Sequence, residues 1–293
     1  MRRILVTGVG GPAGRSLSRQ LVVRGHTVVA VDMAPIDLDG MRVEQVPAAN
    51  DPRFVDELTA IADWHDVDLV LPTVTEELVV LAGGADMLHS GPRAPVVVAP
   101  LDAVTIANDK LLTCQHLAAA GVAVPAFTLP SAIASAVGLE RLLGMPYLSK
   151  PRVGRGGRHT TVHHAAERAH LAQPDDSLLL QEFIPGVEYA PNLYLGRDPA
   201  EDVVVVLAKT ALANGLVGNA LSVERTTAPD VADVARRACR AIGLRGPVDL
   251  DIRRRADGTP VVLEINARFG ANSAHAPEVL DQLLAEHVLA MRA

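Results

Sequence analysis

Three side chains that can do chemistry stand at alternate positions near the C-terminus, in VVLEINARFG (Val261–Gly270). If this stretch is a strand, Glu264, Asn266 and Arg268 line one face, because successive side chains of a strand point to opposite faces. The other face is apolar and carries Leu263, Ile265, Ala267 and Phe269. The flanking hydrophobic runs predict a buried strand, where polar groups are costly to desolvate without partners. The polar row therefore needs a ligand or a set of ion pairs.

The preceding segment supplies acids for the same face. It reads GPVDLDIRR and is followed by the dipeptide DG, a strong hairpin turn signal. A turn centred there places Asp251 opposite Glu264 and Asp249 opposite Asn266. Directly opposed residues lie roughly 4.5–5.5 Å apart at Cβ, so the two carboxylates repel each other unless a cation lies between them.

Two kinds of cation fit this position. Asp251, Glu264 and Asn266 offer only oxygen ligands, which favour a hard ion such as Mg²⁺, with Mn²⁺ as a substitute, held jointly with substrate phosphates. Alternatively, Arg253 or Arg268 neutralises the acids as a structural salt bridge. The hairpin by itself does not decide between these interpretations.

The chain holds only three lysines among its 27 lysine and arginine residues: Lys110, Lys150 and Lys209. Lysine is a compact point charge that suits a phosphate contact. The loop that follows Lys150 in SKPRVGRGGRH contains three glycines, Gly154, Gly156 and Gly157. Such a loop can present backbone N–H groups to a polyphosphate. The alternative is a flexible basic surface loop.

The segment LLLQEFIPGVEYA joins an apolar strand to a linker with two acids, Glu182 and Glu188. A chain that crosses between two lobes can offer backbone hydrogen bonds to an adenine edge, and Glu188 is placed for ribose hydroxyls. The alternative is that both acids are ordinary solvated side chains.

The elements that must position these residues fall into two domains. Residues 1–107 alternate strands with helices and predict a parallel, doubly wound α/β domain. We expect its strands at 3–9, 27–33, 67–74 and 94–100, and its helices at 14–24, 52–64 and 76–87. Residues 108–293 predict a small α+β lobe over about 113–182 and a larger α+β lobe over about 186–293. The expected strands of the larger lobe are 187–195, 202–212, 248–254 and 260–268, with helices at 229–242 and 277–291.

A glycine turn after the first strand admits a different function. Gly8, Gly11 and Gly14, with Asp32 at the end of the next strand, have the spacing of dinucleotide-binding short-chain dehydrogenases. The alternative function is therefore an NAD(P)-dependent oxidoreductase. Those enzymes resemble one another in a Tyr-x-x-x-Lys pair, whereas no tyrosine of this chain has a lysine four positions on.

Composition excludes several other classes. The chain has 293 residues, of which 49% are hydrophobic and 21% charged, and this balance indicates a globular protein with a large core. A net charge of −7 and 3% aromatic content disfavour nucleic-acid and anionic-membrane partners. Two cysteines, Cys114 and Cys239, predict free thiols in a reducing cytoplasm. No stretch predicts a signal peptide or a membrane span, and a homodimer is compatible with this composition.

The order of the motifs resembles the ATP-grasp superfamily: NDK before a helix, KP followed by GRGG, QEFIPGVE, and DLD followed by LEINARFG. The nearest resemblance is to carbamoyl-phosphate synthase-like members, whose last motif commonly reads Glu-hydrophobic-Asn-Pro-Arg; here Ala267 replaces the proline. The first hundred residues resemble the Rossmann-like preATP-grasp domain of that family. The chain shows no second synthase half and no glutaminase part, so we do not expect synthesis of carbamoyl phosphate itself.

The resemblance implies an ATP-grasp fold in which nucleotide lies between two lobes, with the small lobe as a lid. It implies phosphate contacts from Lys110, Lys150, Lys209 and the loop glycines, adenine contacts from Glu182 and the backbone of Phe183 and Ile184, and a ribose contact from Glu188. It also implies magnesium ligands at Asp251, Glu264 and Asn266, and places Arg268 beside the transferred phosphoryl group or the acyl phosphate.

The implied reaction is carboxylate–amine ligation. A substrate carboxylate attacks the γ-phosphoryl group of ATP, and an amine then attacks the acyl phosphate, so that an amide forms and phosphate leaves. The segment NSAHAPEV would border the acceptor pocket, with Ser273 and His275 as substrate contacts. The alternatives are the oxidoreductase and a nucleotide-binding partner without turnover.

Overall fold

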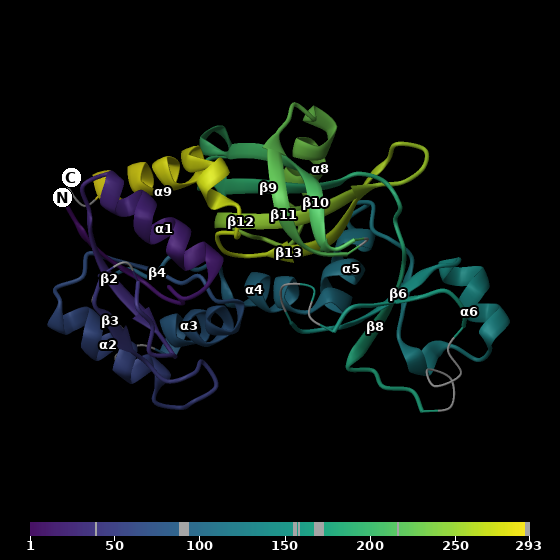
Figure 1. The fold of residues 1–293 in the computed structure, drawn as a ribbon, viewed down its shortest axis with the longest axis horizontal. Helices are drawn as coiled ribbons and strands as arrows, with labels where there is room; N and C mark the ends of the chain where they lie inside the picture. Colours follow the sequence, from purple (N-terminus) through teal and green to yellow (C-terminus); the bar gives the residue numbers. More distant parts are fainter. Residues whose placement is uncertain are drawn as a thin grey trace.

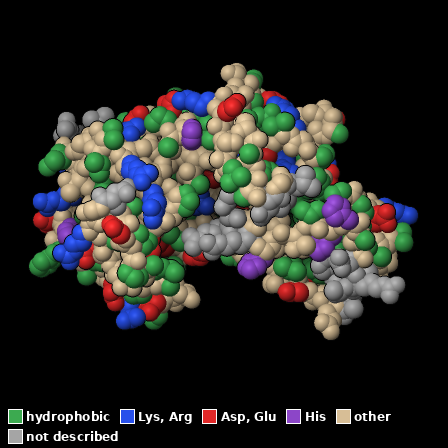
Figure 2. All heavy atoms as spheres, in the orientation of Figure 1, with side chains coloured by type: hydrophobic (Ala, Val, Ile, Leu, Met, Phe, Trp, Pro, Cys, Tyr) green, Lys and Arg blue, Asp and Glu red, His purple; other side chains and the backbone are tan. Residues whose placement is uncertain are grey.

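A computed structural model of the chain describes residues 1–38, 40–87, 94–154, 157, 159–166, 173–215 and 217–290. Figure 1 shows an N-terminal α/β part at the lower left, a small lobe in teal at the right, and a C-terminal sheet in green and yellow above them. On the face drawn in Figure 2, acidic and basic side chains of the described residues are interspersed among hydrophobic and neutral ones. None of the helices within the described ranges is long and apolar enough to cross a membrane.

The first sheet is parallel. Its strands are β1 (Arg3–Val6), β2 (Thr27–Asp32), β3 (Val43–Gln45) and β4 (Leu69–Leu71), and its helices are α1 (Pro12–Val23), α2 (Phe54–Trp64) and α3 (Thr75–Met87). The strand order is β3-β2-β1-β4; α1 connects β1 to β2, and α2 connects β3 to β4. The expected strand at 94–100 is reduced to one bridge between Val70 and Val96, because the prolines at both ends of this segment cannot donate a backbone hydrogen bond.

Two helices connect this part to the rest, α4 (Leu101–Asn108) and α5 (Lys110–Ala119). The predicted boundary between residues 107 and 108 falls in the last turn of α4. Asp109 caps α5, because its carboxylate accepts the N–H groups of Leu111 and Leu112. The N–H of Lys110 donates to the carbonyl of Arg152 at 2.9 Å, which ties the start of α5 to the small lobe.

The small lobe is a four-stranded sheet with one helix. Its elements are β5 (Phe127–Thr128), η1 (Pro130–Ala132), α6 (Ala136–Leu143), β6 (Tyr147–Pro151), β7 (Thr161–His163) and β8 (Leu178–Glu182). The strands are antiparallel in the order β5-β8-β6-β7. Leu139 and Leu143 of α6 pack against Tyr147 and Leu180 of the sheet, which gives the lobe its own small core.

The large sheet has five antiparallel strands in the order β11-β10-β9-β12-β13. Its elements are β9 (Glu188–Leu195), η2 (Pro199–Glu201), β10 (Val203–Asn214), β11 (Val217–Arg225), α8 (Pro229–Ala241), β12 (Gly246–Arg254), β13 (Pro260–Asn266), η3 (Ser273–His275) and α9 (Pro277–Ala290). The four predicted strands are present, whereas β11 was not predicted.

The two faces of this sheet differ in polarity. Leu193, Leu250 and Ile252 point to the face that packs against α8 and α4 and are fully buried there. The opposite face is mixed. Part of it, including Ala190 and Leu207, packs in a second core with Leu280 of α9. Since strand residues alternate between faces, Asn192 and Asp249 also point to this opposite face.

Candidate active site

A cleft of about 420 Å³ opens between the small lobe and the polar face of the large sheet. It is lined by most of the predicted site residues, namely Lys150, Gly157, Glu182, Ile184, Glu188, Lys209, Asp251, Glu264, Asn266 and Arg268. Pro12 of the N-terminal part and Asn272, which follows β13, also reach it. The structure therefore brings together side chains that lie more than a hundred residues apart in the sequence.

The β12–β13 hairpin pairs its acids as expected, with Asp251 opposite Glu264 and Asp249 opposite Asn266. The route to this register differs from the prediction. Near the turn the strands pair one residue out of the predicted register, and a β-bulge between Asp251 and Ile252 restores it. Leu263 is the extra residue of the bulge, so it lines the cleft instead of joining the apolar face.

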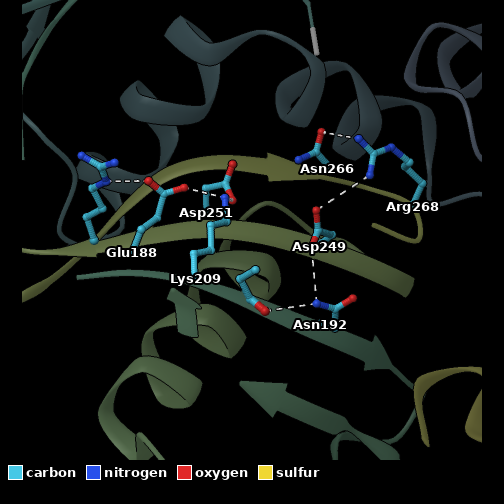
Figure 3. A network of polar contacts seen from close by, with 9 residues as sticks. Glu188, Asn192, Lys209, Asp249, Asp251, Asn266 and Arg268 are labelled. Atoms are coloured by element: carbon cyan, nitrogen blue, oxygen red, sulfur yellow. Dashed lines mark hydrogen bonds and ion pairs between the residues drawn. The ribbon is translucent and has the colours of Figure 1, made fainter. Parts of the chain in front are cut away.

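Lys209 links two of the cleft acids. Its Nζ lies 2.5 Å from Glu188 Oε1 and 2.5 Å from Asp251 Oδ1 (Figure 3). Arg253 Nε lies 2.6 Å from the other Glu188 oxygen. Burial lowers the pKa of Lys209, but the Asp251 and Glu188 carboxylates outweigh burial and raise it above its usual value. Lys209 thus stays charged, and it forms an ion pair with Asp251, which was predicted to bind magnesium.

The other two lysines lie near Glu264; Lys150 lines the cleft, whereas Lys110 contacts Glu264 without lining the cleft itself. Lys110 Nζ is 3.6 Å from Glu264 Oε1 and donates to the carbonyl of Gly154 at 2.9 Å. Lys150 Nζ donates to the carbonyl of Leu263, the bulged residue, at 3.2 Å. Burial lowers the pKa of Lys150, because the side chain is only 6% exposed, and the Glu264 carboxylate opposes this shift. An anionic ligand here would stabilise the buried ammonium groups.

The linker between β8 and β9 borders the cleft as predicted, but the Glu182 carboxylate is already engaged. It accepts the N–H of Ala126 at 2.8 Å and pairs with Arg255. Within the described ranges, no acceptor of the chain receives the backbone N–H of Phe183 or Ile184. The linker therefore offers its backbone, not the Glu182 side chain, to a ligand.

Gln181 lines the cleft but was not predicted from the sequence as a site residue. It is 1% exposed, and its Oε1 has no hydrogen-bond partner among the described residues. The amide nitrogen lies 3.8 Å from Cys114 Sγ. Burial raises the pKa of the Cys114 thiol, which makes it an unreactive neighbour. The free amide oxygen can accept a hydrogen bond from a bound base.

The glycine loop is described in part, since Gly156 lies outside the described residues. Gly154 and Gly157 both have positive φ, 152° and 64°. A Cβ on Gly157 would lie 3.1 Å from Cα of Gly218 in β11, so glycine allows the loop to approach that strand closely. Gly157 and Gly218 both line the cleft at the edge of the large sheet.

Arg268 is held by three acceptors: Thr75 Oγ1 at 3.3 Å, Phe269 O at 2.9 Å and Asn266 Oδ1 at 3.0 Å. Its Nη1 lies 3.8 Å from Asp249 Oδ2 (Figure 3). Burial and, after it, the Asp251 carboxylate raise the pKa of Asp249 to about 7, although Arg268 acts in the opposite direction. This end of the cleft therefore presents one fixed guanidinium and one poorly compensated acid.

Ser273 and His275, the predicted substrate contacts, do not line the cleft. The chain enters η3 after Gly270, which turns these side chains away from the sheet. Ser273 is 2% exposed and donates to Ser16 Oγ at 2.8 Å, while His275 is exposed. Ala271 and Asn272 are the residues after Gly270 that line the cleft.

The protein offers few ligands for the predicted magnesium ion. In the part of the chain that the structure describes, no three Asp, Glu, His or Cys side chains could hold a metal ion together. The predicted set offers two opposed carboxylates and the Asn266 oxygen. Mg²⁺ is commonly bound through one or two carboxylates, with phosphates and water completing its coordination. The residues therefore suit magnesium that arrives with a nucleotide, provided that Lys209 releases Asp251.

The glycine turn after β1, where a dinucleotide would bind, is already in contact with Asp32 and Ile36 of the chain itself. Asp32 accepts the N–H of Gly10 at 2.8 Å and of Ala34 at 3.0 Å, so both carboxylate oxygens are used. A Cβ on Gly10 would lie 2.1 Å from Cδ1 of Ile36, which covers the turn. These contacts give no support to the oxidoreductase alternative.

Comparison with protein families gives an independent result. The ATP-grasp domain family matches residues 107–272, more than half of the chain. The chain therefore belongs to the ATP-grasp family, and the prediction of an ATP-grasp ligase that binds ATP is confirmed.

Curated relatives and solved structures agree with this assignment. D-alanine–D-alanine ligase of Gloeobacter violaceus is 29% identical over 306 residues, 95% of this chain and 93% of the relative. The ligase of the same name from Cupriavidus taiwanensis is 27% identical over 280 residues, 88% of this chain and 80% of the relative.

Among solved structures, an L-amino acid ligase from Bacillus licheniformis has a TM-score of 0.69 at 17% identity, covering 94% of this chain and 69% of that one. An N5-carboxyaminoimidazole synthetase from Staphylococcus aureus, complexed with ADP, has a TM-score of 0.68 at 14% identity, covering 97% and 76%. These two likenesses show a shared fold.

Proposed function

We propose that this chain is an ATP- and magnesium-dependent carboxylate–amine ligase that forms an acyl phosphate and joins an amino acid or another small carboxylate to an amine. The observation that carries the proposal is the gathering of Lys150, Lys209 and the opposed pair Asp251–Glu264 around one cleft of an ATP-grasp chain, with Lys110 at 3.6 Å from Glu264. The D-alanine–D-alanine ligase relatives and the L-amino acid ligase neighbour favour amino acid substrates.

Each side of the cleft has a part in binding ATP. The free N–H groups of the linker at Phe183 and Ile184, with Gln181 Oε1, suit the edge of adenine. Glu188 lines the cleft and would bind the ribose once Lys209 or Arg253 gives up one of its oxygens. Lys110, Lys150 and the glycine loop then hold the phosphates. Magnesium, when bound at Asp251, Glu264 and Asn266, neutralises phosphate charge.

The chain's own groups position the reaction. Arg268, fixed by three hydrogen bonds, stabilises negative charge on the transferred phosphoryl group as the substrate carboxylate attacks it. Lys209, once released from Asp251, is a further phosphate contact. The small lobe excludes water from the acyl phosphate, which would otherwise hydrolyse before the amine arrives.

Finer assignments remain part of the proposal. We infer that residues 1–107 are the Rossmann-like preATP-grasp domain and residues 108–293 the ATP-grasp domain, with the lid over about 113–182 and the C-terminal lobe over about 186–293. The carbamoyl-phosphate synthase-like grouping rests on motif order alone. The cytoplasmic location, the homodimer and the use of Mn²⁺ in place of Mg²⁺ remain predictions from the sequence.

A phosphate-release screen tests this function. Purified protein with Mg-ATP is incubated with pairs of amino acids and amines, and the products are identified by mass spectrometry. We expect phosphate release that depends on a carboxylate, with an amide product, and loss of both in Asp251→Asn and Glu264→Gln. If either variant kept the wild-type rate, the metal assignment would be wrong. Enhanced nicotinamide fluorescence without ATP binding would favour the oxidoreductase instead.

A further inference from the structure

Asp249 is a cleft acid that none of the proposed nucleotide or metal contacts uses. It lies on β12 opposite Asn192 of β9, and its side chain is 14% exposed. Its contacts within the described structure are long: Asn192 Nδ2 at 3.4 Å and Arg268 Nη1 at 3.8 Å (Figure 3). An ionised carboxylate has room for about four hydrogen bonds, and charge-assisted ones measure roughly 2.7–2.9 Å. Asp249 therefore lacks the close donor that a buried acid needs.

The nearby arginine does not fill this need. Arg268 gives its N–H groups to Thr75, Phe269 and Asn266. These bonds hold the guanidinium beside Asp249 without directing a close donor at the carboxylate. The two charged groups thus lie side by side, each able to take a further partner.

The surroundings hold the Asp249 carboxylate in place. A Cβ on Gly270 would lie 2.3 Å from Asp249 Cγ, so glycine at 270 leaves the space that the carboxylate occupies. Asn192 Nδ2 is anchored on the carbonyl of Ala190 at 3.1 Å and meets the carboxylate from the other side. Gly270 and Asn192 thus fix the position of the Asp249 carboxylate.

The other acids of the cleft already have cations. Their partners are Lys209 and Arg253 for Glu188, Lys209 for Asp251, Lys110 for Glu264 and Arg255 for Glu182. Among the cations that the structure describes, Asp249 has only Arg268 at 3.8 Å, and that arginine is placed for the reacting carboxylate. A ligand that brings its own cation to Asp249 would complete the site.

We propose that Asp249 binds the protonated amino group of an α-amino acid whose carboxylate lies at Arg268. An amino acid carries an ammonium and a carboxylate on one carbon, which matches an acid and a guanidinium held 3.8 Å apart. This inference rests on the proposed function and names its carboxylate substrate as an α-amino acid with a free amino group.

The arrangement also decides which substrate supplies the carboxylate of the new amide bond and which supplies the amine. An amino group held by Asp249 keeps its proton and its lone pair is unavailable, so it cannot attack an acyl phosphate. The amino acid in this position is the carboxylate donor, and the amine that attacks comes from a second substrate. Acids that lack the amino group leave Asp249 buried without a partner and bind more weakly.

Two measurements on the wild type and Asp249→Asn test the proposal. The first is binding by saturation-transfer NMR of the twenty proteinogenic amino acids and D-alanine, compared with propionate and lactate. The second is Mg-ATP-dependent hydroxamate formation, in which hydroxylamine replaces the amine substrate, attacks the acyl phosphate and releases phosphate. Asp233→Asn, which removes an exposed acid from α8, is the matched control. Thermal unfolding verifies that each variant folds.

We expect the wild type to bind at least one amino acid and to prefer it over the acid of the same skeleton without the amino group. Asp249→Asn should raise the KM for that amino acid about 10- to 100-fold, as for a lost hydrogen bond to a charged group. It should also remove the preference, while the KM for ATP stays the same. Asp233→Asn should behave like the wild type.

Other outcomes overturn the inference. If Asp249→Asn keeps its preference for the amino group, or weakens both kinds of acid equally, Asp249 does not recognise the ammonium. If only the Mg²⁺ dependence changes, Asp249 is a metal ligand. If Mg-ATP binds and no amino acid does, this inference fails while the nucleotide proposal stands. If amino acids bind through Asp249 and no ATP is consumed, the proposed function fails and the inference stands.

Discussion

Replacing Asp249 by asparagine should change how the stability of the protein depends on pH. Burial and the neighbouring Asp251 carboxylate together raise the pKa of Asp249 from the usual 3.8 to about 7. An acid with a higher pKa in the folded chain binds its proton more tightly there than in the unfolded chain. Between about pH 4 and pH 7 the unfolded chain is the one that loses the proton, so stability falls as pH rises through this window.

The size of the effect follows from the shift. A change of one pKa unit corresponds to about 1.4 kcal/mol, so a shift of about three units gives an upper limit of about 4 kcal/mol. Asparagine carries no charge at any of these pH values. We therefore expect Asp249→Asn to match the wild type near pH 4 and to exceed its free energy of unfolding by about 2–4 kcal/mol at pH 8.

Urea unfolding at pH 4, 5, 6, 7 and 8 in the presence of EDTA measures this difference. EDTA removes divalent ions that would compensate the acid. Asp233→Asn serves as the control, because Asp233 is exposed on α8. If the curves of Asp249→Asn and the wild type run parallel from pH 4 to pH 8, the acid is not destabilised by its surroundings and the reasoning is refuted.

Three further variants test other parts of the site. Lys150→Ala should raise the KM for ATP at least about tenfold, as expected for a lost contact to a charged group, and an unchanged KM would remove Lys150 from the phosphate site. Lys209→Met removes the cation from Asp251, while Glu188 keeps Arg253, and should cost about 3–5 kcal/mol in stability. Calorimetry should show that Mg²⁺ stabilises this variant more than the wild type; equal stabilisation would contradict a metal at Asp251. Gly157→Ala, at a positive φ and close to β11, should slow turnover more than Gly215→Ala, which has a positive φ but no neighbour within 4 Å of its Cβ. Equal turnover rates would show that loop approach is not needed.

Sequence patterns predicted the site well where local rules decide the geometry. Alternation along β12 and β13 placed Asp251 opposite Glu264, and the observed pairing agrees. The turn itself was predicted one residue out of register, and the bulge at Leu263 restored the pairing of the acids. A bulge depends on how both strands pack, so the sequence of the hairpin does not reveal it.

Other features depend on tertiary contacts, which cannot be predicted from the sequence of a single segment. β11 was not predicted, and it pairs with β10 at the edge of the sheet with several register irregularities. Gln181 belongs to an apolar run, and only the packing of β8 under α5 makes its amide a buried group facing the cleft. Ser273 and His275 were expected in the cleft because of their chain position, but η3 turns them away.

Calorimetric titration with ATP tests most directly whether Asp251 and Glu264 hold the metal ion that helps to bind the nucleotide. The wild type and the double variant Asp251→Asn/Glu264→Gln are titrated with Mg²⁺ and with EDTA. We expect the wild type to bind Mg-ATP at least about tenfold more tightly than ATP in EDTA, a difference of about 1.4 kcal/mol, and the double variant to lose that difference. Equal magnesium dependence in both proteins would contradict a metal held by Asp251 and Glu264.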